Sequence, residues 1–109
     1  MKLTELENYT FALYEIGAIE ALIFYLKCFA MEKAEALIKK LERKKQERLN
    51  SMARVERAID GLDDRERLVM RAHYIAGLTW EKIAENLYFS YGTVLRIRKI
   101  ALEKLITGD

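Results

Sequence analysis

The first third of the chain carries an apolar stripe at helical spacing. Apolar residues recur every three or four positions from Leu6 to Leu41, which predicts a helix with one buried face. Gly17 is the only glycine or proline inside this stripe, so a kink or short break is expected there. The stripe consists of Leu6, Tyr9, Leu13, Ile16, Ile19, Ile23, Leu26, Ala30, Ala34, Leu37 and Leu41.

Between Gly17 and Gly61 no residue stops a helix strongly, and Asn50-Ser51 is only a weak candidate. A helix from Ala18 to about Asn50 would be on the order of 48 Å long, too long for a chain this small to cover alone. Between Ala18 and Met31 the other faces are apolar as well, through Leu22, Phe24, Tyr25 and Phe29, and such a helix must be covered on several sides. The sequence therefore predicts a homo-oligomer, most simply a dimer, held by the N-terminal helices. The alternative is a hairpin that folds back near Asn50 or near Gly17.

A shorter amphipathic stretch follows and ends near Gly61, with Met52, Val55, Ile59 and Leu62 on its apolar face. Asp63 and Glu66 have the spacing of a capping box and predict the start of a new helix. This helix is expected to run to about Ala76 and to end at Gly77, which suits the position after a helix C-terminus. Its predicted buried residues are Leu68, Val69, Ala72 and Ile75.

Two further caps follow Gly77. Thr79 is expected to cap a short helix from Trp80 to about Asn86, with Ile83 and Ala84 facing inward. Residues 87–90, Leu-Tyr-Phe-Ser, form a tight turn without glycine, and Ser90 caps a longer helix from Tyr91 to Leu105. A short helix, a turn of about four residues and a longer helix are the layout of a helix-turn-helix.

The last predicted helix has two different faces. At about 100° per residue, Val94, Ile97, Ala101 and Leu105 share one side, and Gly92, Arg96, Lys99 and Glu103 share the opposite one. Small or polar groups at its start (Ser90, Tyr91, Gly92 and Thr93) suit a helix that enters the major groove. A glycine here costs roughly 1 kcal/mol of helix stability and is typical of a backbone that a ligand must approach.

Three basic residues of this helix are candidates for contacts with DNA. Arg96 and Lys99 can reach guanine edges or phosphates. Arg98 falls nearer the core side, so its charged end is expected to reach out toward a phosphate or to pair with an acidic neighbour.

Composition agrees with a helical protein. The chain has 109 residues, no proline and 5 glycines. Its formal net charge of +2 does not by itself indicate nucleic acid. Basic residues concentrate in residues 31–57, with nine basic and five acidic side chains, and in residues 91–105, with four and one. The stretch Lys39–Asn50 is read as a solvated helix face, with a surface that contacts phosphates as the alternative.

Other classes of site find little support. Cys28 is the only cysteine and is expected to be a buried free thiol in a reducing cytoplasm. The apolar run Ala18–Met31 is too short for a membrane span and contains Glu20 and Lys27, and no signal peptide is evident. His73 is the only histidine and is expected to pack between helices. No phosphate-binding loop or catalytic cluster is found, so we expect no enzyme, metal or cofactor.

The segment from Leu62 to Leu105 resembles the fourth region of bacterial sigma factors and the related LuxR-type output domains. The resemblance rests on Gly77, Thr79, Ile83-Ala84, Ser90, Thr93-Val94 and the closing Leu102–Leu105. The segment is still more similar to small phage and prophage regulators of the ArpU type, through His73-Tyr74, Gly77 to Trp80, Ile83-Ala84, Leu87, Ser90 and Ala101 to Leu105. Tyr88 departs from the pattern, because many helix-turn-helix proteins have glycine at that turn.

This resemblance implies a sequence-specific regulator of transcription that binds double-stranded DNA and is encoded by a phage or prophage. Residues 1–61 would be the oligomerisation region and residues 62–109 the DNA-binding domain. A dimer would favour half-sites about one helical turn, or a multiple of it, apart. The predicted DNA-contacting residues are Thr79, Trp80, Lys82, Ser90, Tyr91, Gly92, Thr93, Arg96, Arg98 and Lys99.

Two alternatives stay open at this point. The domain could bind RNA polymerase as an adaptor or anti-activator without reading bases. The chain could also be a structural helical oligomer whose basic face is merely solvated.

Overall fold

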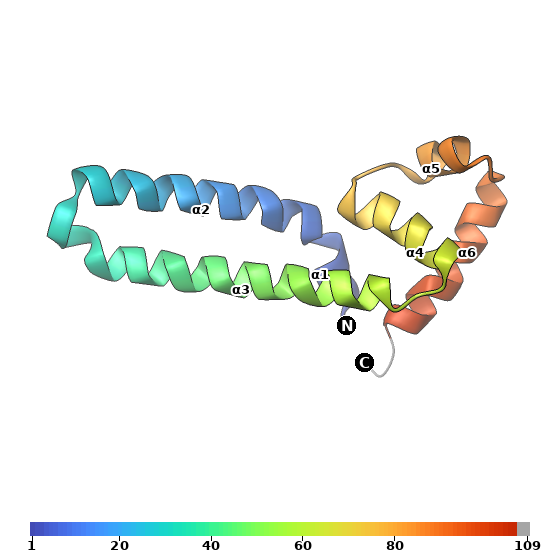
Figure 1. Ribbon diagram of the computed structural model, residues 1–109, viewed down its shortest axis with the longest axis horizontal. Coiled ribbons are helices and arrows are strands. Elements are labelled where there is room, and N and C mark those ends of the chain that lie inside the picture. The colour runs from blue at the N-terminus through green and yellow to red at the C-terminus, as the bar shows by residue number, and fades with distance from the viewer. Residues whose placement is uncertain (107–109) are drawn as a thin grey trace.

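The computed structural model describes residues 1–106, and every regular element in that range is helical (Figure 1). It confirms the predicted all-α fold, with a long N-terminal helical region followed by a C-terminal helix-turn-helix. The elements are α1 (Leu3–Glu7), α2 (Tyr9–Phe29), the 3-10 turn η1 (Met31–Ala34), α3 (Glu35–Asp60), α4 (Asp64–Met70), the π-helical turn η2 (Arg71–Ile75), α5 (Trp80–Leu87) and α6 (Tyr91–Leu105).

The N-terminal half is an antiparallel hairpin of α2 and α3, which fills most of the 57 Å length of the molecule (Figure 1). The chain reverses through η1, so the continuous helix expected from Ala18 to Asn50 is wrong, as are the two expected reversal points. α2 continues through Gly17, and α3 continues through Asn50. The reversal needs no glycine or proline, because folding back buries the apolar stripe of Ile16, Ile19 and Ile23 on the side of α2 that packs against α3.

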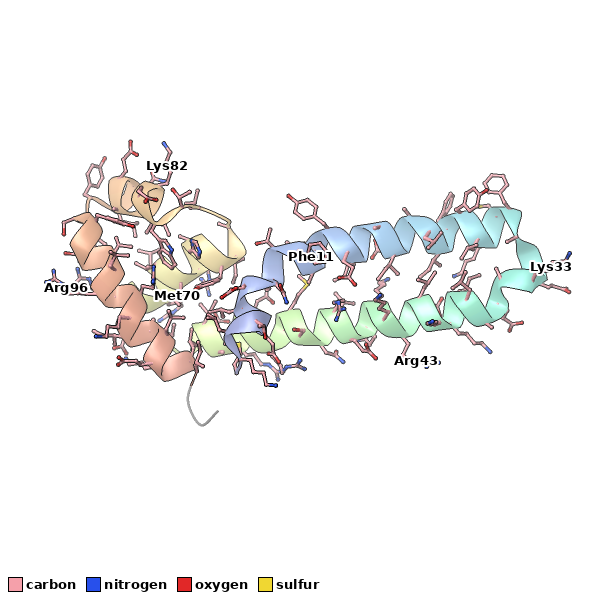
Figure 2. All side chains as sticks on the ribbon, turned by 180° about the vertical axis from the view of Figure 1, so that it is seen from behind. Phe11, Lys33, Arg43, Met70, Lys82 and Arg96 are labelled. Atoms are coloured by element: carbon pink, nitrogen blue, oxygen red, sulfur yellow. The ribbon has the colours of Figure 1, made fainter. Side chains whose placement is uncertain are left out.

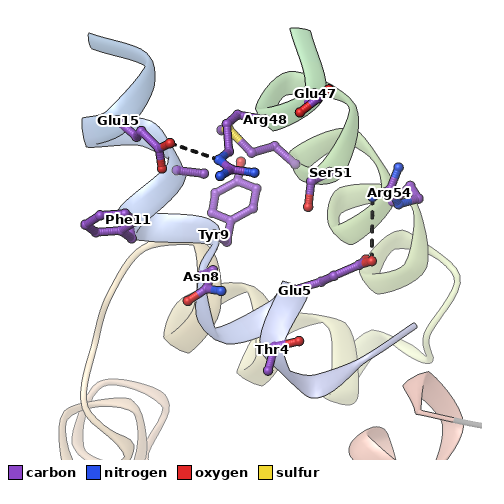
Figure 3. A pocket seen from close by; sticks show the side chains of 12 residues that line it. Thr4, Glu5, Asn8, Tyr9, Phe11, Glu15, Glu47, Arg48, Ser51 and Arg54 are labelled. Carbon is purple, nitrogen blue, oxygen red and sulfur yellow. Dashed lines mark hydrogen bonds and ion pairs between the residues drawn. The ribbon is translucent and has the colours of Figure 1, made fainter. Parts of the chain in front are cut away.

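Ion pairs connect the two arms of the hairpin. Each of the three charged residues of α2 faces an oppositely charged residue of α3. Part of the basic stretch Lys39–Asn50 is therefore engaged within the chain, and Figure 3 shows one of these pairs together with Glu5–Arg54. The pairs of α2 with α3 are Glu15–Arg48 at 3.1 Å, Glu20–Lys45 at 3.3 Å and Lys27–Glu42 at 3.7 Å.

Because α3 covers only one side of α2, the opposite side of α2 stays exposed. Cys28 lies on that side and is exposed, so the prediction of a buried thiol is wrong. Leu13 and Leu37 are also exposed, although they belong to the predicted stripe. Periodicity alone does not say which of two apolar sides will find a partner.

The hairpin and the C-terminal helices share one hydrophobic cluster. Leu6 of α1, Tyr9 of α2 and Val55 and Ile59 of α3 pack with residues from α4 to α6. The phenolic hydroxyl of Tyr9 donates to Glu56 Oε1 at 2.5 Å. The C-terminal members of the cluster are Leu62, Met70, Tyr74, Ala101 and Leu105, so this core extends across the expected boundary between residues 61 and 62.

The local signals around α4 are confirmed. Glu66 Oε1 accepts a hydrogen bond from the backbone N–H of Asp63 at 3.4 Å in a capping box, and Gly77 has φ of +80°. The expected burial of Leu68 is wrong, since its side chain is 50% exposed. α4 instead buries Val69 and Met70 in two different clusters, which leaves Leu68 facing outward.

Candidate nucleic-acid interface

Two helix caps and one left-handed residue shape the helix-turn-helix, and the two caps were predicted from the sequence. Thr79 Oγ1 accepts a hydrogen bond from the Lys82 backbone N–H at 3.1 Å and caps α5. Ser90 Oγ accepts from the Thr93 backbone N–H at 3.1 Å and caps α6. Between them Tyr88 has φ of 58°, in the left-handed region where glycine is common. The turn therefore has the ordinary backbone geometry with a tyrosine in the place of glycine.

The two faces of α6 are those that the helical wheel predicted. Val94, Ile97, Ala101 and Leu105 are buried, and Val94 and Ile97 pack against Ile83 and Ala84 of α5. The opposite face is exposed and consists of Gly92, Arg96, Lys99 and Glu103. α5 thus covers part of the inner face of α6, and the opposite face remains in solvent.

A chain of hydrogen bonds orders the start of that face. The Ser90 and Thr93 hydroxyl oxygens are 2.8 Å apart, and Arg96 Nη2 donates to Thr93 Oγ1 at 3.1 Å. These contacts hold the guanidinium of Arg96 near the N-terminal half of α6. Figure 2 shows Arg96 at the end of the molecule opposite Lys33 in the hairpin turn.

Gly92 has a surface role rather than a packing role. A Cβ atom at this position would meet no other atom within 4 Å. The fold itself therefore does not need glycine here, although glycine weakens the first turn of α6. The backbone at this position is open to anything that approaches from outside.

Arg96 and Lys99 are available to an anionic ligand. Within residues 1–106 neither forms an ion pair with a carboxylate. Lys104, by contrast, contacts Glu66 at 2.8 Å and Asp63 at 3.3 Å, and the hydrogen bond to Glu66 is the main cause that raises the pKa of Lys104. Carboxylates thus engage Lys104, whereas Arg96 and Lys99 on the outer face contact no carboxylate in this part of the chain.

Two predicted contact residues lie elsewhere. Trp80 is half-buried and stacks on His73, with ring centroids 3.7 Å apart, and the Arg98 guanidinium lies 5.2 Å from the Trp80 ring. Arg98 and Arg96 point about 160° apart around α6. The structure groups His73, Trp80 and Arg98 in a hollow beside α1, so Arg98 reaches an aromatic ring instead of the outer face. His73 packs as expected and donates through Nδ1 to the Leu78 carbonyl at 2.7 Å.

The remaining predicted residues surround the outer face. Tyr91 is exposed at the first turn of α6, and Lys82 is exposed on α5, where its Nζ lies 3.6 Å from Glu85. Thr79 and Ser90 use their side-chain oxygens as caps, so any contact with a ligand would be additional to that role.

One further cation, Arg65, lies beside the turn between α5 and α6. Arg65 of α4 lies with its guanidinium 4.8 Å from the ring of Phe89, next to the turn. The contact joins residues 24 positions apart, so no local pattern of the sequence indicated it.

Other kinds of site find no support in the described part of the chain. No group of three or more histidine, cysteine, aspartate or glutamate residues there could hold a metal ion. None of its helices combines the length and apolar character that crossing a bilayer requires.

These features define the C-terminal part as a helix-turn-helix of the kind that binds DNA. Residues 58–105 match the family model described as Sigma-70, region 4, which covers 48 of the 109 residues, from the end of α3 to the end of α6. The predicted resemblance to sigma region 4 is thus confirmed for this segment, and the resemblance to ArpU-type regulators stays a prediction. No curated protein and no solved structure matches the chain.

Proposed function

We propose that the protein is a sequence-specific regulator of transcription that binds double-stranded DNA with α6 in the major groove. The observation that carries this proposal is the outer face of α6, where Arg96 and Lys99 follow the open backbone at Gly92 by about one and two helical turns. Packing within residues 1–106 does not require that combination, and a groove-reading helix uses all three features.

The roles follow from the geometry of each residue. Arg96, tethered to Thr93, is suited to a bidentate contact with guanine, and Tyr91 and Thr93 lie beside it at the entry of the groove. Lys99 and Lys82 would contact phosphates on either side. Thr79, Ser90 and Gly92 would bring backbone N–H groups near phosphates, because helix N-termini favour anions.

Trp80 and Arg98 would act indirectly. Their stack with His73 fixes the start of α5 against α6, and this sets the angle at which the outer face meets DNA. The assignment of the chain to a phage or prophage regulator is part of the same proposal and rests only on the likeness of residues 73–105 to such proteins.

The two parts of the chain would have different roles. Residues 62–109 would bind DNA, and residues 1–61 would hold two copies together in a homodimer. The single core that joins both parts would keep each DNA-binding end in a fixed position relative to its hairpin.

The test is selection from a random pool of double-stranded DNA at two salt concentrations, followed by affinity measurements on the enriched site. Arg96→Ala is expected to raise the dissociation constant about 10- to 100-fold, the usual worth of a bidentate contact with guanine, and to relax sequence preference at one position. Lys33→Ala is the control for the loss of one positive charge, because Lys33 is exposed in the hairpin turn, at the end of the molecule opposite Arg96 (Figure 2).

Equal effects of both substitutions would contradict the proposed readout. Retention of DNA only at low salt and without an enriched motif would also contradict it, since such binding reflects counterion release alone. RNA polymerase subunits would then become the partners to examine.

A further inference from the structure

The outer side of α2, which faces away from α3, is an exposed apolar surface that the proposed DNA binding does not explain. Exposed apolar residues follow this side with a three- and four-residue spacing from one end of α2 to the other. Figure 3 shows Phe11 pointing away from α3, whereas Tyr9 points toward it. We call this surface the outer α2 face; it consists of Phe11, Tyr14, Ala18, Ala21, Leu22, Tyr25, Cys28 and Phe29.

The outer α2 face carries no charge. α2 has three charged residues, Glu15, Glu20 and Lys27, and each pairs with α3 on the other side of the helix. A helical surface open to water normally carries charged side chains. α2 has 21 residues and no charge on its outer face. Such an uncharged, exposed helix face indicates a surface that another molecule covers.

The area of this face suits a protein partner. Phe11, Tyr14, Tyr25 and Phe29 are exposed to 65%, 75%, 57% and 72%. At about 150–250 Å² for a fully covered aromatic side chain, these four rings expose roughly 500 Å² together. Leu22 and the two alanines add to that figure, which approaches the 800 Å² or so that each partner buries in a standard interface.

The outer α2 face has small side chains at its centre and large aromatic side chains toward both ends. Two large residues, Phe11 and Tyr14, precede two small ones, Ala18 and Ala21, and two large ones, Tyr25 and Phe29, follow. A two-fold axis between Ala18 and Ala21 would bring Tyr14 opposite Tyr25 of a second copy and Ala18 opposite its Ala21. Two-fold dimers require such a self-complementary face, and the alanines let the two helix backbones approach closely.

We propose that the outer α2 face binds the same face of a second copy, with the two α2 helices antiparallel. This inference deepens the self-association proposed above and does not depend on DNA binding. In Figure 1, α5 lies farther from α3 than α2 does, so the helix-turn-helix extends beyond the level of α2 on its outer side. Two parallel copies would place these extensions in the same space, whereas antiparallel copies place them at opposite ends. Opposed helix dipoles favour the same arrangement.

The arrangement has a consequence for function. The outer faces of the two α6 helices would lie at opposite ends of the dimer, because Arg96 lies at the end of each molecule away from the hairpin turn (Figure 2). One dimer would then hold two separate DNA segments, instead of the closely spaced half-sites that the sequence alone suggested.

The first experiment is sedimentation of the full chain without DNA. We expect a mass of twice 12.8 kDa. Ala18→Glu is expected to weaken association at least 100-fold, because it places two like charges at the centre of the interface. Ala53→Glu makes the same change at an exposed alanine of α3 outside the face and should leave association unchanged. Circular dichroism checks that both variants keep their helices.

The second experiment uses Cys28, the only cysteine of the chain, to establish the orientation. Antiparallel helices place the two Cys28 residues about 25 Å apart, too far for a disulfide, and place Phe11 opposite Cys28 of the second copy. Oxidation should therefore leave the native dimer uncrosslinked and should crosslink F11C, but not F11C/C28S. Sedimentation establishes that both F11C variants are still dimers at the concentration used.

Three results would overturn the inference. A native chain that stays monomeric would show that the outer α2 face does not bind a second copy. Equal association of the Ala18→Glu and Ala53→Glu variants would locate the interface elsewhere. A disulfide between the Cys28 residues of the two native copies would show that the α2 helices pair in parallel.

Discussion

The shared core predicts that a single leucine near the N-terminus stabilises the distant helix-turn-helix. Leu6 is fully buried in a five-residue helix and packs in the cluster that contains Ala101 and Leu105 of α6. Leu6→Ala removes about three methylene equivalents, worth roughly 2.4 kcal/mol of transfer free energy at about 0.8 kcal/mol each. The residual cavity raises the expected loss in the free energy of unfolding to about 3 kcal/mol, within the usual range for buried leucines.

The assay is urea denaturation with two probes at matched protein concentration. Circular dichroism reports mainly on the long hairpin helices, and fluorescence of Trp80, the only tryptophan, reports on the helix-turn-helix. Both transitions should coincide in the native chain, and Leu6→Ala should move both midpoints down by about 1–2 M urea. The matched control is Leu3→Ala in the same short helix, where the side chain is 40% exposed and the expected loss is below about 1 kcal/mol.

Two results would refute this reasoning. If Leu6→Ala shifted only the circular dichroism transition, the hairpin and the helix-turn-helix would unfold separately and would not share one core. If Leu6→Ala and Leu3→Ala cost the same, α1 would detach before the rest of the chain unfolds, and its burial would contribute little to stability.

Three further predictions follow from single residues. Tyr88→Gly should raise the free energy of unfolding by about 0.5–1 kcal/mol in urea melts, because Tyr88 is 96% exposed and has φ of 58°; a loss of stability would reveal a contact of its ring. Burial and the hydrogen bond to Glu56 raise the pKa of Tyr9 to about 12, above its unfolded value of 10.0, so the resulting stability should be complete below pH 10 and fall between pH 10 and 12. Tyr9→Phe should lack that part of the fall, and matching pH profiles for the two proteins would contradict the assignment. Lys99→Ala should reduce the slope of log affinity for DNA against log salt by about 1, and an unchanged slope would remove Lys99 from the phosphate contacts.

Sequence by itself determined where α4, α5 and α6 begin and which two faces α6 has. Asp63, Thr79 and Ser90 cap helices at the predicted positions, and Gly77 ends one where expected. α6 spans Tyr91–Leu105 as predicted. These features depend on hydrogen bonds within three or four residues and on the helical period, so a short window of sequence contains all the information they need.

Only the tertiary structure decided which apolar surfaces become buried. α2 is apolar on two opposite sides, and its sequence does not say that α3 would cover the side of Ile19 and leave Cys28 exposed. The position of the chain reversal could not be predicted for the same reason. Packing between α2 and α3 determines it, and the reversal contains no glycine or proline. The contact of Arg98 with the Trp80 ring could not be predicted from the sequence either, since it depends on how α5 packs against α6. The apolar pattern of a helix indicates which of its faces can be buried, and the positions of the neighbouring helices decide which face is buried.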